Sequence, residues 1–530
     1  MAYQYKVLGQ TVELEVDPSV VAVRFDDTQP KSKRAEATAR AGAGPFAKRF
    51  EVPGEKLTLV PVTPTPAPGP ALAAMTMSSL NAQTDVDRAQ PVFRVGGNQV
   101  VASDRVIVGV DNEEVKTALA QKFELTELRA WDGAAVFQLP AAADVFQLIQ
   151  ELDAEPGVRY AEPDFVTIGR HIPRRVAPAA GAVLSDPMVA QQYAMALTRS
   201  VDAWAIQRGC REISIAILDE GVDVEHTDLK AAIVGSYDGI DDDSFQTPNG
   251  WDGHGTACAG LAAAVPVNDI GIGGSGGGCS LLAVRIAYSE IPHGPWVTSN
   301  EAIARSIAWS WRNGAAILSN SWGGGLPSSA IIEEFENARR YGRNGLGCVV
   351  VIAAGNDHGP VSFPGTLPNV ITVAASNEYD EPKTPTSADG ETWWGTNHGP
   401  EIDVAAPGVH NLTTDISGAA GYDPTDFAGT FNGTSSATPI VAGICGLVLS
   451  ANPNLREYEV RELIRNTAAK VGSIPYVSGR NDYFGHGRVD ALAAVQAAGA
   501  PSGIMLTAVD TTGEAPAQAE PTLSEPGTED

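Results

Sequence analysis

Short apolar runs alternate with helix-like segments between residues 185 and 500. Six runs have the length of strands, and they are Ile213–Leu218, Leu281–Ile286, Ala315–Leu318, Cys348–Ala353, Val370–Ala374 and Ile402–Val404. Segments of helical character, such as Thr298–Arg312 and Ala330–Tyr341, lie between them. Parallel strands that are buried on both faces are continuous apolar runs, so this pattern predicts an α/β domain with a mostly parallel sheet.

A smaller α+β unit is predicted over residues 92–170. Its expected elements, in chain order, are a strand at 105–110, a helix at 113–123, a strand pair at 126–139, a helix at 142–152 and a strand at 158–166. The order βαββαβ is that of the ferredoxin-like arrangement. By itself this unit is typical of a binding or packing module.

The remaining segments have simpler patterns. Residues 1–25 alternate between apolar and polar side chains, which predicts a strand hairpin. Residues 26–90 contain Lys/Arg clusters and a Pro-Thr run, so 1–91 is interpreted as a hairpin followed by a Pro-rich linker. Residues 171–184 form a polar joint, and the acidic tail 501–530 has no Lys or Arg and is expected to be disordered.

Charge and composition narrow the classes of partner and location. The 530 residues carry a formal net charge of −28, which disfavours binding to nucleic acid or to anionic membranes. We find neither a secretory leader nor a run of about 18 apolar residues, so no membrane span is expected. The five cysteines are scattered and odd in number, which favours free thiols. We therefore expect a cytoplasmic monomer, with export by a route that needs no leader as the alternative.

The stretch 432–443 places a serine at the start of an apolar helix. Ser435 follows Gly433 and Thr434, and an almost wholly apolar run continues to Leu449. The start of a helix offers free N–H groups that can hold a developing oxyanion. Pro439 is expected within the first helical turns, where no hydrogen-bond donor is lost. Gly-Thr-Ser also caps many ordinary helices, so this stretch alone leaves both interpretations open.

Three further segments carry groups that suit nucleophilic catalysis. Asp219 ends an apolar strand, His254 begins a helix of small residues between two glycines, and Asn356 follows a buried strand. A carboxylate can orient an imidazole, which takes the proton of a serine hydroxyl as that hydroxyl attacks a carbonyl. The chain order Asp219, His254, Ser435 is the order found in subtilisin.

With these four motifs the chain resembles the subtilisin-like serine proteases, the subtilases of peptidase family S8. The resemblance covers residues 185–500, and residues 92–170 resemble the inhibitory prodomain of that family. It implies a three-layer αβα fold with a mostly parallel sheet, preceded by a small ferredoxin-like α+β prodomain. It also implies that Ser435 is the nucleophile, His254 the general base and then acid, and Asp219 the orienting carboxylate, while Asn356 and the Ser435 N–H form the oxyanion hole.

The resemblance also implies where a peptide substrate binds. Ser321, Trp322 and Gly323 match the strand with which substrates pair. Glu220 stands beside the catalytic aspartate, as an acid does in the kexin/furin-type proprotein convertases, where it helps to accept a basic P2 residue. Glycines follow Trp322 where those enzymes place acidic residues, so a basic P1 residue and an aromatic or aliphatic one remain alternatives.

Calcium is the cofactor that the resemblance implies. The side chains of Asp186, Asp228 and Asn268, together with the carbonyl groups of Val265, Ile270 and Ile272, match the ligands of a family calcium site. Carboxylate, amide and carbonyl oxygens are the ligands that Ca²⁺ takes. The acidic run Asp241–Asp243, with Asp238, is either a second ion site or a solvated run of charges.

Together these features predict a calcium-binding serine endopeptidase made as a self-processing zymogen. It would hydrolyse peptide bonds through an acyl-enzyme, with a protein or peptide as substrate and its own prodomain as intramolecular inhibitor. Cleavage is expected between residues 166 and 186, and the pair Arg174-Arg175 is one candidate site. The alternatives are an inactive binding protein of the same fold and a maturation protease or peptide ligase dedicated to one partner.

Overall fold

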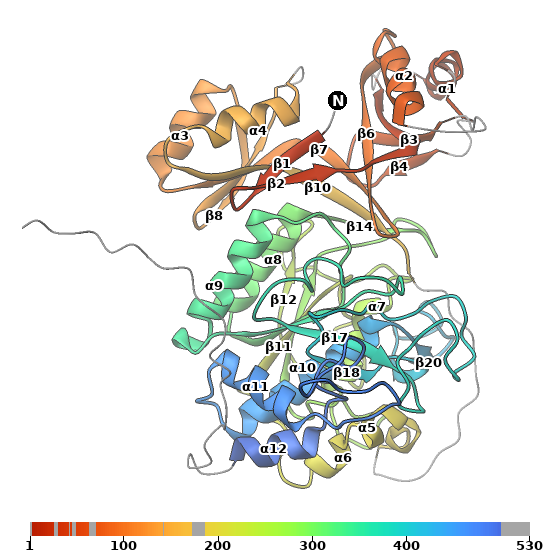
Figure 1. Ribbon diagram of the computed structural model, residues 1–530, viewed down its shortest axis with the longest axis vertical. Helices are drawn as coiled ribbons and strands as arrows, with labels where there is room; N and C mark the ends of the chain where they lie inside the picture. The colour runs from red at the N-terminus through yellow and green to blue at the C-terminus, as the bar shows by residue number, and fades with distance from the viewer. Residues whose placement is uncertain are drawn as a thin grey trace, which may run out of the picture.

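The computed structural model describes residues 3–25, 30–41, 43–44, 49–62, 70–140, 143–171 and 186–499. The larger C-terminal unit lies below an N-terminal assembly of strands and helices in Figure 1. The Pro-rich run, most of the joint 171–184 and the acidic tail, three of the segments discussed above, lie outside the described residues.

A seven-stranded parallel sheet forms the centre of the C-terminal unit. Its order is β12-β13-β11-β15-β16-β17-β18, and every neighbouring pair is parallel. The bounds are β11 (Ser214–Asp219), β12 (Ile233–Asp238), β13 (Ser280–Arg285), β15 (Ala315–Asn320), β16 (Val349–Ala353), β17 (Ile371–Ser376) and β18 (Val404–Pro407). All six predicted strands are present. The edge strand β12 was not predicted, because its short and half-polar sequence lacks an apolar run.

Helices cover both faces of this sheet, which confirms the predicted three-layer fold. One face packs against α7 (His254–Ala263), α10 (Thr434–Ala451), α11 (Glu457–Thr467) and α12 (Ala491–Gly499), and the other against α8 (Asn300–Arg312) and α9 (Ser329–Gly345). By length and composition alone α10 could cross a membrane, but 89% of it is buried inside the protein. It is therefore the central helix of the core.

Short elements complete the C-terminal unit. They are the 3-10 turn η2 (Val189–Gln191), α5 (Tyr193–Leu197), α6 (Ser200–Ala203), β14 (Trp296–Ser299) and the antiparallel pair β19 (Asn411–Thr414) and β20 (Phe427–Phe431). β20 ends just before the turn that leads into α10, so this pair borders the start of the central helix.

The α+β unit has the predicted order βαββαβ. Its elements are β7 (Asn98–Val110), α3 (Glu113–Lys122), β8 (Thr126–Trp131), β9 (Ala134–Gln138), α4 (Val145–Asp153) and β10 (Val158–Gly169). The strands lie in the order β8-β9-β7-β10 and all pairs are antiparallel. Buried side chains of this sheet, among them Ile107 and Tyr160, pack against the same core as α8 and α9.

The interpretation of residues 26–90 as a linker is wrong for most of that segment. The hairpin predicted for residues 1–25 is present only in the first part of that segment, as β1 (Tyr3–Val7) and β2 (Gln10–Leu14), and the rest of the segment pairs with other strands. This hairpin is followed by β3 (Val16–Phe25), α1 (Lys31–Arg40), β4 (Phe50–Val52), β5 (Leu57–Pro61), α2 (Pro70–Asn81) and β6 (Val86–Val95). Strands β6-β3-β5-β4 extend the prodomain sheet, and Val21, Val60 and Leu80 form a local core. This core joins residues far apart in sequence, so local composition did not reveal it.

Two buried carboxylates on β10 join the N-terminal assembly to the C-terminal unit. Glu162 accepts hydrogen bonds from the backbone N–H groups of Ser329 (2.7 Å) and Ala330 (3.3 Å) at the start of α9. Asp164 accepts one from the N–H of Glu301 (3.0 Å) at the start of α8. Both carboxylates are fully buried. Helix N-termini carry unpaired donors and partial positive charge, so each acid stabilises one helix of the other unit.

Glu162 gives the docking of the two units a specific pH dependence. Burial raises the pKa of Glu162 to about 7, from 4.5 in the unfolded chain. Its stabilising contribution is therefore complete below about pH 4.5 and is lost as the pH rises through about 7. In Ser435→Ala protein, the free energy of unfolding should fall by on the order of 2–3 kcal/mol over this range through Glu162 alone. Glu162→Gln should remove that part of the slope in urea titrations at pH 5, 6, 7 and 8. Identical slopes in the two proteins would contradict this assignment.

Candidate active site

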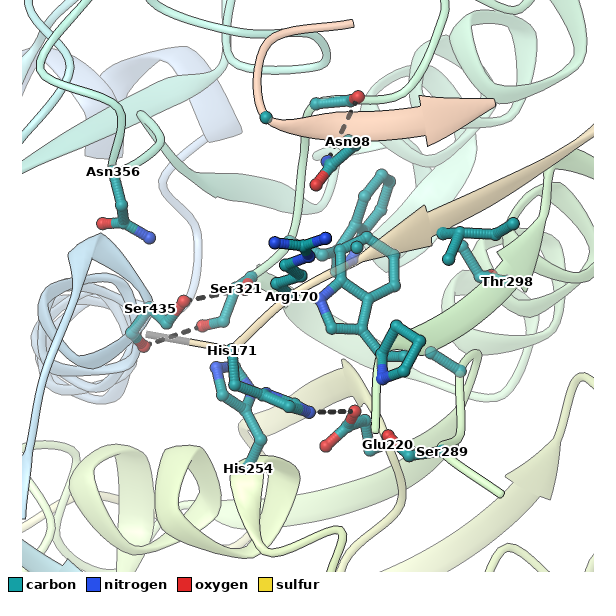
Figure 2. Close-up of a pocket in the computed structure, with 18 of the residues that line it drawn as sticks. Asn98, Arg170, His171, Glu220, His254, Ser289, Thr298, Ser321, Asn356 and Ser435 are labelled. Atoms are coloured by element: carbon teal, nitrogen blue, oxygen red, sulfur yellow. Dashed lines mark hydrogen bonds and ion pairs between the residues drawn. The ribbon is translucent and has the colours of Figure 1, made fainter. Parts of the chain in front are cut away.

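Ser435 lies in the first turn of α10, where it is largely buried and lines the cleft. The helix begins after Gly433, whose φ of 110° is readily reached only by glycine. The Ser435 hydroxyl donates a hydrogen bond to the Ser321 carbonyl oxygen (3.1 Å), and the Ser321 hydroxyl donates one to the Ser435 carbonyl oxygen (3.0 Å). Figure 2 shows both contacts. Ser435 is thus joined by two hydrogen bonds to the residue that follows the carboxyl end of β15.

Pro439 explains why the Ser435 carbonyl oxygen is available. Pro439 is the sixth residue of α10, so the expectation that it lies where no donor is lost is wrong. A helical residue at this position would donate to the carbonyl group four residues earlier, which is that of Ser435. Here that oxygen accepts from Ser321 and from the Cys258 thiol (3.5 Å). The missing helical bond is replaced by side chains from β15 and α7.

His254 and Asp219 form the expected imidazole–carboxylate pair. His254 is the first residue of α7 and Asp219 the last of β11, and His254 Nδ1 lies 2.8 Å from Asp219 Oδ1. Because a carboxylate accepts hydrogen bonds, this contact places the proton on Nδ1 and leaves Nε2 free to accept one. The Phe431 ring packs against the imidazole in a T-shaped contact, with ring centroids 5.2 Å apart.

Asn356 is held with its amide nitrogen available to the cleft. Its Oδ1 accepts hydrogen bonds from the backbone N–H (2.8 Å) and the hydroxyl (3.0 Å) of Thr434. Because both Thr434 groups donate hydrogen bonds, they fix the oxygen of the Asn356 amide on their side. The Nδ2 group therefore lies on the side that faces Ser435 in Figure 2. An amide N–H at this place can stabilise an oxyanion.

The chain that follows β10 runs into this site. β10 pairs in antiparallel fashion with β14, with Val166 opposite Ser299 and Gly169 opposite Trp296. Two residues further on, the His171 ring lies 5.9 Å from the His254 ring, centroid to centroid. Among the described residues no hydrogen bond joins Ser435 to His254. His171 was not predicted as a site residue, because nothing in its local sequence marks it.

Glu220 and Asp252 form an acidic pocket around the His171 imidazole. Glu220 Oε1 lies 3.2 Å from His171 Nε2. Within the described part of the chain no other group donates a hydrogen bond to the Glu220 carboxylate. Asp252 Oδ1 is buried without a partner there as well. Burial, followed by the charge of Glu220, raises the pKa of Asp252 to about 6. Two buried acids with unsatisfied oxygens define a pocket for a cationic side chain.

The predicted substrate strand is contacted by the N-terminal assembly. Asn98, at the start of β7, donates from its amide to the carbonyl oxygens of Gly323 and Gly324 (3.3 Å each). The large cleft, about 1650 Å³, is lined by Ser321, Trp322 and Gly323 together with Asn98 and the catalytic side chains. A side chain of the prodomain sheet therefore binds the carbonyl group of Gly323, which belongs to the strand that the resemblance assigns to substrate.

The residues predicted to bind calcium are brought together on one side of the C-terminal unit. Asn268 donates from its side chain to Asp228 (2.8 Å) and from its backbone to Asp186 (2.9 Å). Val265 donates from its backbone to the Asp228 carbonyl oxygen, and Ile272 to the Asp228 carboxylate. Among the ion pairs of the described residues none involves Asp186 or Asp228. Two buried carboxylates without a cationic partner fit a hard divalent cation. Ile270, the sixth predicted ligand, lies in the same loop and is partly exposed.

The second acidic cluster has cationic partners in the protein. Asp238 pairs with Arg285 (3.0 Å), and Asp242 pairs with Arg305 and accepts from the Tyr237 hydroxyl. These carboxylates are therefore compensated by arginine, which disfavours the interpretation as a second ion site.

A serine hydroxyl, an imidazole–carboxylate pair and an amide donor at the carboxyl edge of a parallel sheet define a serine hydrolase site. Residues 211–487, just over half of the chain, match the model of the subtilase family of peptidases. The chain belongs to the subtilase family. Residues 87–164 match the model of the fervidolysin N-terminal prodomain.

Curated relatives agree with this assignment. The chain is 36% identical over 314 residues to thermitase of Thermoactinomyces vulgaris, covering 59% of this chain and 99% of that protein. It is 32% identical over 390 residues to the calcium-dependent protease of Nostoc sp., covering 67% of this chain but only 56% of that protein. It is 37% identical over 320 residues to the halolysin-like extracellular serine protease Nep of Natrialba magadii, covering 59% of this chain and 53% of that protein.

A solved structure shares the fold. Fervidolysin from Fervidobacterium pennivorans, a keratinolytic enzyme related to subtilisin, aligns with a TM-score of 0.58 at 21% identity, covering 74% of this chain and 61% of fervidolysin. This likeness concerns the fold.

The expectation of a cytoplasmic location is wrong. It is contradicted by the relatives, one of which is named an extracellular protease. The expectation rested on the absence of an apolar leader and on unpaired cysteines. All five cysteines are indeed free thiols in the structure, but neither observation records where a folded protein is found.

Cys258 should make the site sensitive to soft metals. Its thiol lies 3.9 Å from His254 Nδ1, and Asp219, His254 and Cys258 offer three ligand atoms within 4.8 Å of one another. Burial holds the pKa of Cys258 well above its usual value, so alkylating agents, which attack thiolates, should react slowly. A mercurial should abolish peptide hydrolysis by displacing His254, and Cys258→Ala should keep activity in its presence. Full turnover by mercurated wild-type protein would refute this.

Proposed function

We propose that the protein is a calcium-binding serine endopeptidase made as a self-processing zymogen. The observation that carries this proposal is the course of β10, which pairs with β14 and leads His171 to the catalytic imidazole. A segment bound along an edge strand beside the nucleophile lies as a peptide substrate would. The complete set of catalytic groups disfavours an inactive binding protein.

Hydrolysis would begin with a shift of one hydrogen bond. The Ser435 hydroxyl leaves the Ser321 carbonyl oxygen and donates to His254 Nε2, which takes the proton as Oγ attacks the scissile carbonyl carbon. Asp219 stabilises the imidazolium. The Asn356 amide and the Ser435 N–H hold the oxyanion, and His254 passes the proton to the leaving amine. A water molecule activated by His254 then releases the acyl group from Ser435.

Calcium would be held by Asp186, Asp228 and Asn268, with carbonyl groups of Val265, Ile270 and Ile272. When bound, it would neutralise the two buried carboxylates and tie the start of the C-terminal unit to the loop 265–272. Asp186 is the first described residue after the joint in which cleavage is expected. The ion would thus stabilise the segment that processing converts into a chain end. Relatives named calcium-dependent proteases support this proposal.

The acidic pocket favours substrates with a cationic P2 side chain. His171, the first residue of the joint, contacts Glu220. Burial alone would lower the pKa of His171, but the charge and hydrogen bond of Glu220 and the charges of Asp252 and Asp219 together raise it. A lysine or arginine at the same position would place its charge between Glu220 and Asp252. The P1 residue is either aromatic or aliphatic, or basic.

Self-processing is tested by intact mass. Wild-type protein incubated with calcium should lose its N-terminal assembly through a cut between residues 166 and 186, and incubation with a chelator should slow that cut. Ser435→Ala should stay intact under both conditions. Processing of pure Ser435→Ala protein, or no processing of wild type followed by no peptide hydrolysis, would refute the proposal.

The pocket is tested with peptide pairs that differ only at P2. Wild-type protein should favour Lys over norleucine in kcat/KM, and Glu220→Gln should reduce this preference by about tenfold or more, as expected for the loss of one buried charge pair. Asp252→Asn should reduce it as well. The ratio of the two kcat/KM values, for Lys and for norleucine at P2, does not depend on how much active enzyme each preparation contains. An unchanged ratio in both variants would show that these acids do not select P2.

A further inference from the structure

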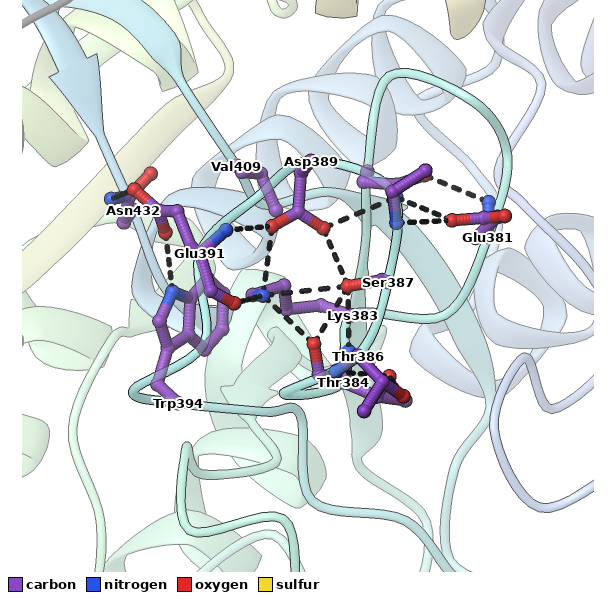
Figure 3. Close-up of polar contacts among 12 residues, drawn as sticks. Glu381, Lys383, Thr384, Thr386, Ser387, Asp389, Glu391, Trp394, Val409 and Asn432 are labelled. Carbon is purple, nitrogen blue, oxygen red and sulfur yellow. Dashed lines mark hydrogen bonds and ion pairs between the residues drawn. The ribbon is translucent and has the colours of Figure 1, made fainter.

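Lys383 is fully buried in a long loop between β17 and β18. The loop spans residues 377–397, and the side chains of Lys383 and Asp389 have no exposed surface. Figure 3 shows the loop folded around this lysine. A buried ammonium group is costly unless it is paired and hydrogen-bonded, so the loop has to supply oxygen atoms around it.

Four oxygen atoms surround the Lys383 ammonium. They are Asp389 Oδ1 (2.9 Å), the carbonyl oxygens of Thr384 (2.9 Å) and Glu391 (2.5 Å), and Ser387 Oγ (3.4 Å). The Trp394 ring lies 5.1 Å away on another side. We call these four oxygens the ammonium cage. One carboxylate, two carbonyl groups and a hydroxyl are ligands that a free monovalent cation would take, so the lysine acts as a cation attached to the chain.

The cage is connected to the residue that precedes the nucleophile turn. Glu391 supplies a carbonyl oxygen to the cage, and its carboxylate accepts hydrogen bonds from Asn432 Nδ2 (2.8 Å) and Trp394 Nε1 (2.6 Å). It also pairs with His410 (3.3 Å), whose backbone N–H donates to Asn432 Oδ1 (2.7 Å). Asn432 is therefore held at both ends of its amide, immediately before Gly433 and the start of α10.

The same loop also holds the oxyanion turn. Asn397, at its end, donates from Nδ2 to the Ala354 carbonyl oxygen (3.2 Å), and its Oδ1 accepts from the N–H of Asp357 (2.9 Å). Its backbone N–H donates to the Gly355 carbonyl oxygen (2.8 Å). These contacts bracket Asn356. The same loop thus contacts the residue before the Gly433 turn that leads to Ser435 and the residues on either side of Asn356.

We propose that Lys383 is a positioning residue, a built-in cation whose cage sets the relative placement of Ser435 and Asn356. This inference rests on the proposed endopeptidase function. Removal of the ammonium leaves Asp389 and the carbonyl groups without a counter-charge, so the loop relaxes and Glu391 no longer holds Asn432. A displacement of the nucleophile should appear in kcat, because substrate is bound mainly by the cleft.

The test is replacement of the missing cation from solution. In Lys383→Ala the side chain lacks three carbon atoms and the ammonium group, which propylammonium supplies. We expect kcat to fall by about 10²-fold with little change in KM, as for a small misplacement of reacting groups, and propylammonium to restore much of it. The same concentration of 1-propanol, and sodium chloride at equal ionic strength, should restore nothing. Lys383→Met, which fills the cage with an apolar chain, should show no rescue.

Several outcomes would overturn the inference. They are a wild-type kcat in Lys383→Ala, equal rescue by 1-propanol, and recovery of the melting temperature without recovery of kcat. If Lys383→Ala does not fold in any of these solutions, Glu391→Gln decides. It keeps the carbonyl oxygen that Glu391 gives to the cage and changes only the carboxylate that binds Asn432, Trp394 and His410. A lower kcat with unchanged melting temperature would support the inference, and an unchanged kcat would refute it.

Wild-type protein is measured alongside. If processed wild type hydrolyses no peptide, the proposed function fails and kcat gives no comparison. The rise of the Lys383→Ala melting temperature with propylammonium, absent in wild type and with 1-propanol, then still tests the cage by itself.

Discussion

The arrangement of this molecule depends on two carboxylates buried between its two units. Glu162 and Asp164 stand on one strand, two residues apart, and therefore on the same face of β10. Each accepts hydrogen bonds from the first turn of a different helix. Because the two helices contact β10 at two points, their positions determine both where β10 lies on the C-terminal unit and in which direction it runs. The strand then has one course, along β14 and toward His254. Docking and occupation of the cleft are consequences of the same pair of contacts.

The residues of the candidate site could be picked out from sequence because each stands at the end or the start of a helix or strand. Asp219 ends an apolar strand, His254 begins a helix, and Ser435 follows a glycine with positive φ. The ends of strands and the starts of helices can be recognised from the residues next to them in the sequence. The parallel sheet was predictable for a similar reason, since its strands are short apolar runs.

Features that arise from tertiary contact were not predictable. The core formed by residues 21–89 joins strands and helices that are each weakly patterned, and its part within residues 26–90 was misinterpreted as a linker. His171 and Asp252 become site residues only because β10 delivers one beside Glu220 and the other is buried there. Pro439 was placed correctly in sequence but misinterpreted, because the partners that replace its missing donor come from β15 and α7.

The pairing of β10 with β14 has a consequence for the mature form. β14 is an outer strand of the sheet that it shares with the prodomain, and β10 covers its hydrogen-bonding edge. Departure of the prodomain would turn this into an open edge, which accepts any extended chain through main-chain contacts. Loops of neighbouring copies are such chains. If the proposed self-processing takes place, a loop of a neighbouring copy could bind along β14 of the released C-terminal unit in a crowded solution. The N-terminal assembly would block that contact for as long as it stays in place.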